Sequence, residues 1–86
     1  MKNIVIFASG SGTNAENIIR YFSNRTSARV CLVLSNRREA YVHKRAASFN
    51  VPSVFFDRND FYENGKVLKL LKAYDVDFVV LAGFLW

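Results

Sequence analysis

The residues best suited to chemistry form a short glycine-rich segment, residues 10–15 (GSGTNA). Glycines let the backbone adopt positive φ and approach a ligand closely. The segment follows an apolar run and opens an amphipathic one, so its amide N–H groups are expected at a helix start, where the helix dipole favours anions. The hydroxyls of Ser11 and Thr13 and the amide of Asn14 add neutral donors. These features predict a cradle for a phosphate group.

Other interpretations of this segment stay open. A tight strand-to-helix turn of small residues explains it without any ligand. A nucleoside triphosphate loop is excluded, because the required Gly-Lys-[Ser/Thr] is missing. The segment also fits G-x-G-x-x-[G/A], the dinucleotide fingerprint. An NAD site needs an acid about 20 residues further on, but Ser35 and Asn36 stand there, followed by Arg37 and Arg38. The two arginines suit a 2′-phosphate, so an NADP-binding oxidoreductase domain is the alternative function.

Few other residues carry chemistry. His43, the only histidine, has no acidic or cysteine neighbour, and we expect a solvated or half-buried helix residue there. Cys31 lies in an apolar run and is expected to be buried as an apolar residue. The chain has no cluster of cysteine and histidine, so no metal site is expected.

The chain alternates between two hydrophobic periodicities. β-branched and aromatic runs predict four strands, at residues 3–8, 29–34, 51–56 and 77–81. Spacings of three and four residues predict three helices, from residue 14 to about 22, over about 40–49, and around 67–74.

Two pairs of residues have the spacing of a capping box, which marks a helix start. Thr13 and Glu16 have it at the first helix, and Asp60 and Glu63 repeat it before the third. We therefore expect these pairs to fix where the two helices begin.

Strand–helix alternation predicts an α/β fold, a Rossmann-like open parallel sheet with strand order 3-2-1-4 and crossover helices. Pro52 near the start of the third strand suits an edge position. Ligands bind such sheets beyond the carboxyl ends, where the strand order reverses. Residues 9–14 and 82–86 are expected to meet there, so the topology indicates the glycine segment independently of its motif.

Length and composition narrow the function classes. The 86 residues allow one small domain, and 22% of them are charged, which is globular composition. The net charge of +5 comes from dispersed lysines and arginines, so no nucleic-acid partner is expected, while a small phosphorylated ligand is favoured. The single cysteine, the lack of a long apolar run and the lack of a signal peptide predict a cytoplasmic protein with no membrane partner.

The last nine residues, 78–86 (FVVLAGFLW), are apolar and follow directly on a predicted strand. Leaving several large side chains in water forfeits several kcal/mol, at about 25 cal/mol per Å². We therefore expect residues 1–86 to be the N-terminal, substrate-phosphate-binding part of a larger domain.

Three separated blocks resemble one enzyme family. Residues 4–14 (IVIFASGSGTN), 34–36 (LSN) and 77–84 (DFVVLAGF) are similar to the opening, the second-strand ending and the fourth strand of the glycinamide ribonucleotide formyltransferases. Together the blocks span the chain. The related formyltetrahydrofolate hydrolases are the nearest competing family, but the loop at residues 12–14 resembles the transferases.

The resemblance implies a reaction and a phosphate site. The family transfers the formyl group of its co-substrate, 10-formyltetrahydrofolate, to the amino group of glycinamide ribonucleotide in de novo purine biosynthesis, without a metal. By resemblance, Gly12, Thr13 and Asn14 bind the ribose phosphate of the substrate. This agrees with the cradle inferred from the residues themselves.

The resemblance also implies roles near the C-terminus. Gly83 lies in the substrate-side turn, and Leu85 and Trp86 begin the segment along the folate, although the family commonly has Met-Arg there. The family often has a basic residue before the third helix, where Asn59 stands beside Arg58.

The catalytic Asn, His and Asp of the family lie downstream, so no catalytic residue is expected within residues 1–86. Formyl transfer needs a positioned acid–base and a group that stabilises the oxyanion. The segment alone is therefore expected to be inactive. A non-catalytic α/β fragment is the third interpretation, and the oligomeric state is left open.

Overall fold

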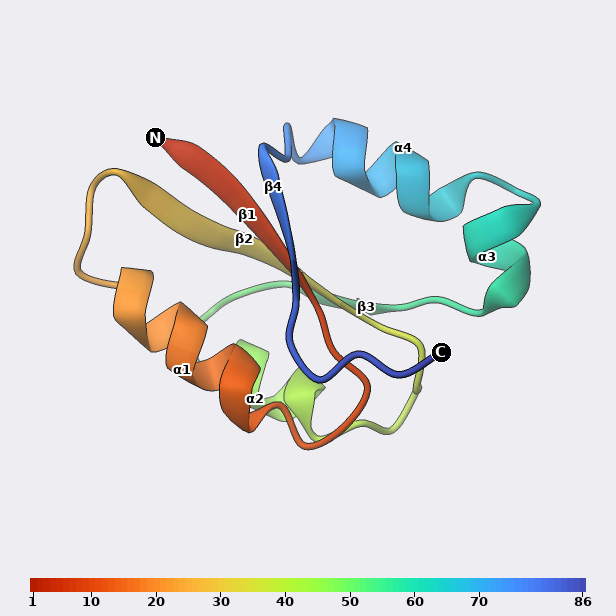
Figure 1. Cartoon of the computed structure of the whole chain (residues 1–86), viewed down its shortest axis with the longest axis horizontal. Coiled ribbons are helices and arrows are strands. Elements are labelled where there is room, and N and C mark those ends of the chain that lie inside the picture. Colours follow the sequence, from red (N-terminus) through yellow and green to blue (C-terminus); the bar gives the residue numbers. More distant parts are fainter.

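The computed structural model describes residues 1–86, and its four strands form one parallel sheet (Figure 1). Its order is β3-β2-β1-β4, which confirms the predicted α/β topology. The strands lie within two residues of the predicted bounds, at β1 (Lys2–Phe7), β2 (Ala28–Ser35), β3 (Ser53–Phe55) and β4 (Phe78–Leu81).

Helices cover both faces of this sheet (Figure 1). One layer holds α1 (Thr13–Phe22) and α2 (Val42–Ser48), and the other holds α3 (Arg58–Tyr62) and α4 (Lys66–Ala73). None of the four is long and apolar enough to cross a membrane.

The central strand β1 divides its side chains between two cores. Ile4 and Ile6 pack into the cluster under α1 and α2, whereas Val5 and Phe7 pack into the cluster under α4. Successive strand residues point to opposite faces, so a continuous apolar run is needed when both faces are covered. This explains why the run at residues 3–8 shows no polar alternation.

Strand β2 breaks this alternation at Cys31. The register with β1 shifts between Ile4 and Val5, which pair with Val30 and Leu32 and leave Cys31 opposite neither. Cys31 and Leu32 consequently face the same core, and the Cys31 thiol donates to the carbonyl of Ile4 at 3.5 Å. The bulge is thus accommodated by a buried small residue.

The predicted capping box at the first helix is wrong. The N-cap of α1 is Gly12, in the left-handed conformation, and no side chain caps the helix. Thr13 is already helical, and its hydroxyl lies 3.2 Å from that of Ser11. The Glu16 carboxylate is bound by Arg20 and Arg45, so it does not turn back to the N-cap.

The capping prediction before the third helix is also wrong, because two helices replace the one expected. The capping box joins Asp57 and Asp60 and starts the short helix α3, while Glu63 lies at its C-terminal end. Gly65, with φ +72°, then begins α4. The Asp57–Asp60 pair has the same three-residue spacing as the predicted Asp60–Glu63 pair, but it lies three residues earlier in the chain.

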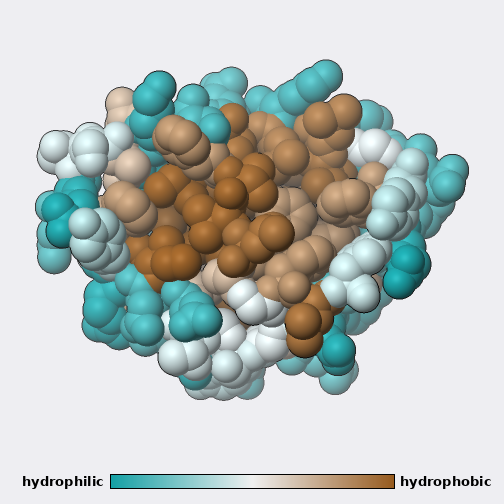
Figure 2. Space-filling model, viewed as in Figure 1, coloured by the Kyte–Doolittle hydropathy of each residue, from teal (hydrophilic) through white to brown (hydrophobic).

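The two sheet edges differ. β3 is short and follows Pro52, as predicted for an edge strand. β4 is the other edge, where Phe78, Val79 and Leu81 are 55%, 52% and 67% exposed. In the same view, apolar surface occupies the centre of the face on which β4 runs (Figure 2). This apolar strand is therefore largely exposed in residues 1–86, as the sequence predicted.

Candidate functional site

A cavity of about 240 Å³ lies beyond the carboxyl ends of β1 and β4. It is lined by the loop of residues 10–14 and by Ala82 and Gly83. The topology predicted that these two segments would meet at this point. Four of the predicted site residues, Gly12, Thr13, Asn14 and Gly83, come together in this one cavity.

The loop that lines the cavity requires a glycine at position 12. The φ of Gly12 is +82°, and a Cβ there would lie 2.5 Å from Val42 Cγ2 and 2.8 Å from Val42 Cα. The loop therefore packs directly on the start of α2. No side chain fits at this position without moving backbone, so the sequence must hold glycine here.

The N-terminus of α1 presents amide donors that the protein itself does not use. The first N–H groups of a helix have no intrahelical acceptor. The amides of Gly12, Thr13, Asn14 and Ala15 make no hydrogen bond to backbone or side chain. Together with the positive end of the helix dipole, they form a cluster of donors suited to an anion.

Ser9 joins the two segments that line the cavity. This side chain is 2% exposed, and its hydroxyl accepts the backbone N–H of Leu85 at 2.7 Å. It lies 2.7 Å from Asn36 Oδ1 and 3.0 Å from the carbonyl of Leu85, and its one proton serves one of these acceptors at a time. The Asn36 amide donates to the same Leu85 carbonyl at 2.7 Å. The ends of β1, β2 and β4 are thus held as one unit.

A contact that the sequence did not suggest comes from α2. Arg45 donates to the Ser11 carbonyl at 2.7 Å and to the Glu16 carboxylate at 2.9 Å. Hydrogen bonds from Arg45, and then from Arg20, hold the pKa of Glu16 below its ordinary value. No local spacing rule connects residues 11 and 45, so only the packing of α2 against α1 shows this link.

The segment after β4 leads away from the cavity. The Leu85 side chain is 71% exposed, whereas the Trp86 ring stacks on Phe56 and Phe84 with centroids 5.6 and 5.8 Å away. The Trp86 indole donates to the Tyr62 hydroxyl at 3.0 Å, and the Arg58 guanidinium lies 4.9 Å from its ring centroid. Arg58 rather than Asn59 therefore approaches this segment.

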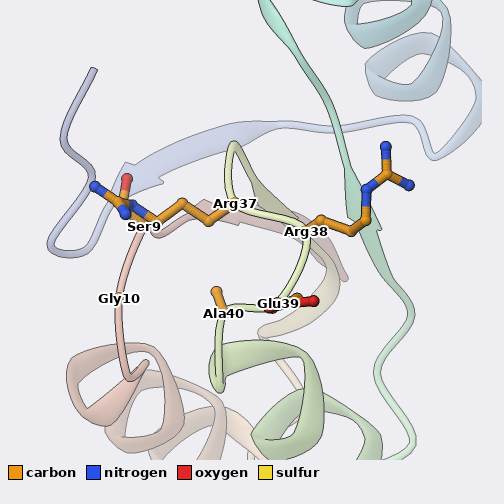
Figure 3. A pocket seen from close by; sticks show the side chains of 6 residues that line it. All are labelled: Ser9, Gly10, Arg37, Arg38, Glu39 and Ala40. Atoms are coloured by element: carbon orange, nitrogen blue, oxygen red, sulfur yellow. The ribbon is translucent and has the colours of Figure 1, made fainter.

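A second, larger cavity of about 620 Å³ contains the two arginines of the oxidoreductase alternative (Figure 3). Arg37 extends toward Ser9, whereas Arg38 extends the opposite way. The Arg38 guanidinium lies 4.4 Å from the ring centroid of Phe55. The two guanidinium groups diverge, so they do not form the paired clamp that a 2′-phosphate needs.

His43 and Cys31, for which the sequence predicted no catalytic or metal-binding role, contribute to packing and hydrogen bonding within the fold. His43 is half-buried and contacts the Ser53 hydroxyl at 2.8 Å and the Arg37 carbonyl at 3.1 Å, so it ties α2 to β3. Cys31 is buried, and burial raises the pKa of its thiol. Both outcomes agree with the predictions.

Comparison with known families decides between the alternatives. The family model described as formyl transferase matches residues 2–86. The chain belongs to the formyl transferase family. This membership supports the transferase interpretation and not the NADP-binding oxidoreductase.

Two bacterial relatives of this chain carry the same name. The phosphoribosylglycinamide formyltransferase of Bacillus subtilis is 32% identical over 91 residues, which cover 99% of this chain and 46% of that protein. The phosphoribosylglycinamide formyltransferase of Haemophilus influenzae is 34% identical over 90 residues, covering 99% of this chain and 42% of that one.

Solved structures agree with this formyl transferase fold. The glycinamide ribonucleotide transformylase 1 of Geobacillus kaustophilus superposes with a TM-score of 0.87 at 36% identity, covering 100% of this chain and 48% of that one. The phosphoribosylglycinamide formyltransferase of Anaplasma phagocytophilum gives 0.89 at 30% identity, covering 99% and 41%. The chain therefore spans somewhat less than half the length of these four relatives.

Proposed function

We propose that the protein containing this chain transfers the formyl group of 10-formyltetrahydrofolate to the amino group of glycinamide ribonucleotide, in de novo purine biosynthesis in the cytoplasm. The observation that carries this proposal is the cluster of unused amide donors at Gly12, Thr13 and Asn14, in a chain of the formyl transferase family. Relatives named phosphoribosylglycinamide formyltransferases support the choice of substrate.

The phosphate is the part of the substrate that these residues are suited to bind. In the proposal, the amides of Gly12, Thr13 and Asn14 donate to the phosphate oxygens at the positive end of α1. Gly83 has φ +69°, and a Cβ at this residue would meet no heavy atom within 4 Å, so the opposite wall of the cavity is open. The net charge of +5 favours the approach of the anionic substrate.

The folate is proposed to lie along the segment that starts at Leu85 and Trp86. This segment offers one exposed aliphatic residue, Leu85, and a tryptophan, Trp86, that is 43% exposed as a residue. The Arg58 guanidinium beside the indole adds a positive charge, which suits the carboxylates of a folate. In this proposal, the phosphate cradle and the apolar, basic surface for the folate lie on either side of the Gly83 turn.

The reaction itself sets what the rest of the protein must supply. The amino nitrogen attacks the formyl carbon and forms a tetrahedral intermediate; the bond from that carbon to N10 of the folate then breaks. The attacking nitrogen loses one proton and N10 gains one. This transfer needs an acid–base group and an oxyanion donor. No carboxylate lines the cavity, and the Glu16 carboxylate in the first turn of α1 is paired with two arginines. We propose that the catalytic groups lie elsewhere in the protein.

Binding calorimetry on the natural protein tests this function. We expect glycinamide ribonucleotide to bind, and its dephosphorylated riboside to bind at least about tenfold more weakly, because each charge-assisted hydrogen bond adds about 1.5–3 kcal/mol. Equal affinity for the two compounds, or formyl transfer to water instead of to the amine, would contradict the proposal.

A further inference from the structure

The Arg45 side chain connects α2 to the loop that is proposed to bind phosphate. Its Nε donates to the Ser11 carbonyl at 2.7 Å, and its Nη1 donates to the Glu16 carboxylate at 2.9 Å. The side chain is 26% exposed, and its guanidinium lies 4.9 Å from the ring centroid of Tyr41. The guanidinium group is thus held by two hydrogen bonds, one to the loop and one to the first turn of α1.

This contact determines which way one peptide group faces. In a trans peptide the C=O and the following N–H point in opposite directions within one plane. The Ser11 carbonyl points to Arg45, so the N–H of Gly12 points away from Arg45. That N–H is one of the unused donors. The bond to Arg45 therefore opposes a flip that would replace a donor by a carbonyl oxygen in the cradle.

The same side chain controls a negative charge near the site. Glu16 lies in the first turn of α1, where a carboxylate competes with an external anion for the helix terminus. Arg45 and Arg20 bind one oxygen each of this carboxylate, at 2.9 and 2.8 Å. The charge is thus compensated and held away from the free amides.

We infer that Arg45 is a positioning residue for the phosphate-binding loop: it holds the Ser11–Gly12 peptide in the orientation that directs the Gly12 N–H to the substrate phosphate. This inference rests on the proposed function. It assigns no contact between Arg45 and the substrate, because the guanidinium is already occupied by the Ser11 carbonyl and Glu16.

Arg20 supplies a matched control. It pairs with the same carboxylate at 2.8 Å but has no hydrogen bond to the loop, and its side chain is 64% exposed. In the natural protein, we expect Arg45→Ala to raise the KM for glycinamide ribonucleotide about tenfold with little change in kcat, a loss in the range of one hydrogen bond to a charged group. Arg20→Ala is expected to change KM less than about twofold. Arg45→Lys should recover only part of the loss, because one ammonium cannot reproduce the fork.

A second pair of variants separates the peptide contact from the charge effect. If Arg45 acts only by neutralising Glu16, then Glu16→Gln in the Arg45→Ala background restores KM. Our inference predicts that the double variant remains weak, and that inorganic phosphate protects the wild type better than either Arg45→Ala protein against thermal unfolding. Wild-type binding with an unchanged KM in Arg45→Ala would overturn the inference alone, whereas no binding by the wild type would overturn the proposed function.

Discussion

The Ser9 hydroxyl accepts the backbone N–H of Leu85 at 2.7 Å, across 76 positions of sequence. This bond joins the residue before the glycine loop to the segment after β4. The two halves of the cavity are therefore fixed relative to one another by a buried side chain.

Replacing Ser9 tests this link. Ser9→Ala leaves the Leu85 N–H without its acceptor, so we expect the free energy of unfolding to fall by about 1–3 kcal/mol. Urea denaturation measures the change. Ser11→Ala is the control, because that exposed hydroxyl contacts only Thr13 Oγ1, and we expect less than about 0.5 kcal/mol. Equal losses in the two variants would show that the buried hydroxyl has no special role.

The two glycines of the loop should respond differently to alanine. Gly12→Ala forces a Cβ to within 2.8 Å of Val42 Cα at positive φ, so we expect a loss of about 2–5 kcal/mol in stability. Gly10→Ala meets no atom within 4 Å and should change stability little. Thermal unfolding of both variants measures this. A Gly12→Ala protein as stable as the wild type would mean that the loop does not pack on α2 as described.

Substitution of Asn14 separates the two function classes weighed in the sequence. Asn14→Asp places a negative charge in the cradle with little change of shape, so we expect glycinamide ribonucleotide to bind more than about tenfold more weakly. Arg37→Ala with Arg38→Ala should leave that affinity within about twofold. The reverse ranking, measured by calorimetry, would favour a site in the larger cavity.

Acid should remove the contribution of Glu16 to stability. Hydrogen bonds from Arg45 and Arg20 lower its pKa in the folded state below the ordinary 4.5, so its stabilisation is present above that value and is lost as the pH falls through the folded pKa. The Glu16→Gln variant should therefore be less stable than the wild type near neutral pH, and the difference should vanish in acid. Denaturation curves at about pH 7 and about pH 3 measure this. A difference that is constant with pH would contradict the ion-pair account.

The exposed edge strand predicts how residues 1–86 behave on their own. We propose that further parts of a larger formyl transferase domain cover β4 in the natural protein. The isolated 86-residue chain should then self-associate, because an apolar edge strand pairs readily with other chains. Val79→Lys with Leu81→Lys should reduce the association, and Leu68→Lys on α4 should not. Sedimentation measures it, and a cooperatively folded wild-type monomer at high concentration would contradict the proposal.

Much of the fold follows from the sequence because both core faces are encoded locally. Apolar runs set the strands, and Pro52 indicated the edge position of β3. The helix starts were less predictable. Capping depends on which acceptor is free, and the Glu16 carboxylate is taken by Arg45 from another helix. A three-residue spacing cannot distinguish Asp57–Asp60 from Asp60–Glu63, so α3 was missed.

The candidate site was predictable only in its binding loop. Glycines and a helix start mark residues 12–14, and the reversal of strand order brings Gly83 to them. The residues that hold the loop, Ser9 and Arg45, act through contacts over 76 and 34 positions. Such contacts depend on the packed structure, and no local pattern indicates them.

The central claim is that amides at the start of α1 bind the phosphate of glycinamide ribonucleotide. Amide chemical shifts of the natural protein, recorded with the nucleotide and with its dephosphorylated riboside, test it most directly. We predict large shifts of the Gly12, Thr13 and Asn14 amides with the nucleotide only. Unchanged signals at these three residues under saturating nucleotide, with the shifts gathered instead at Arg37 and Arg38, would contradict it.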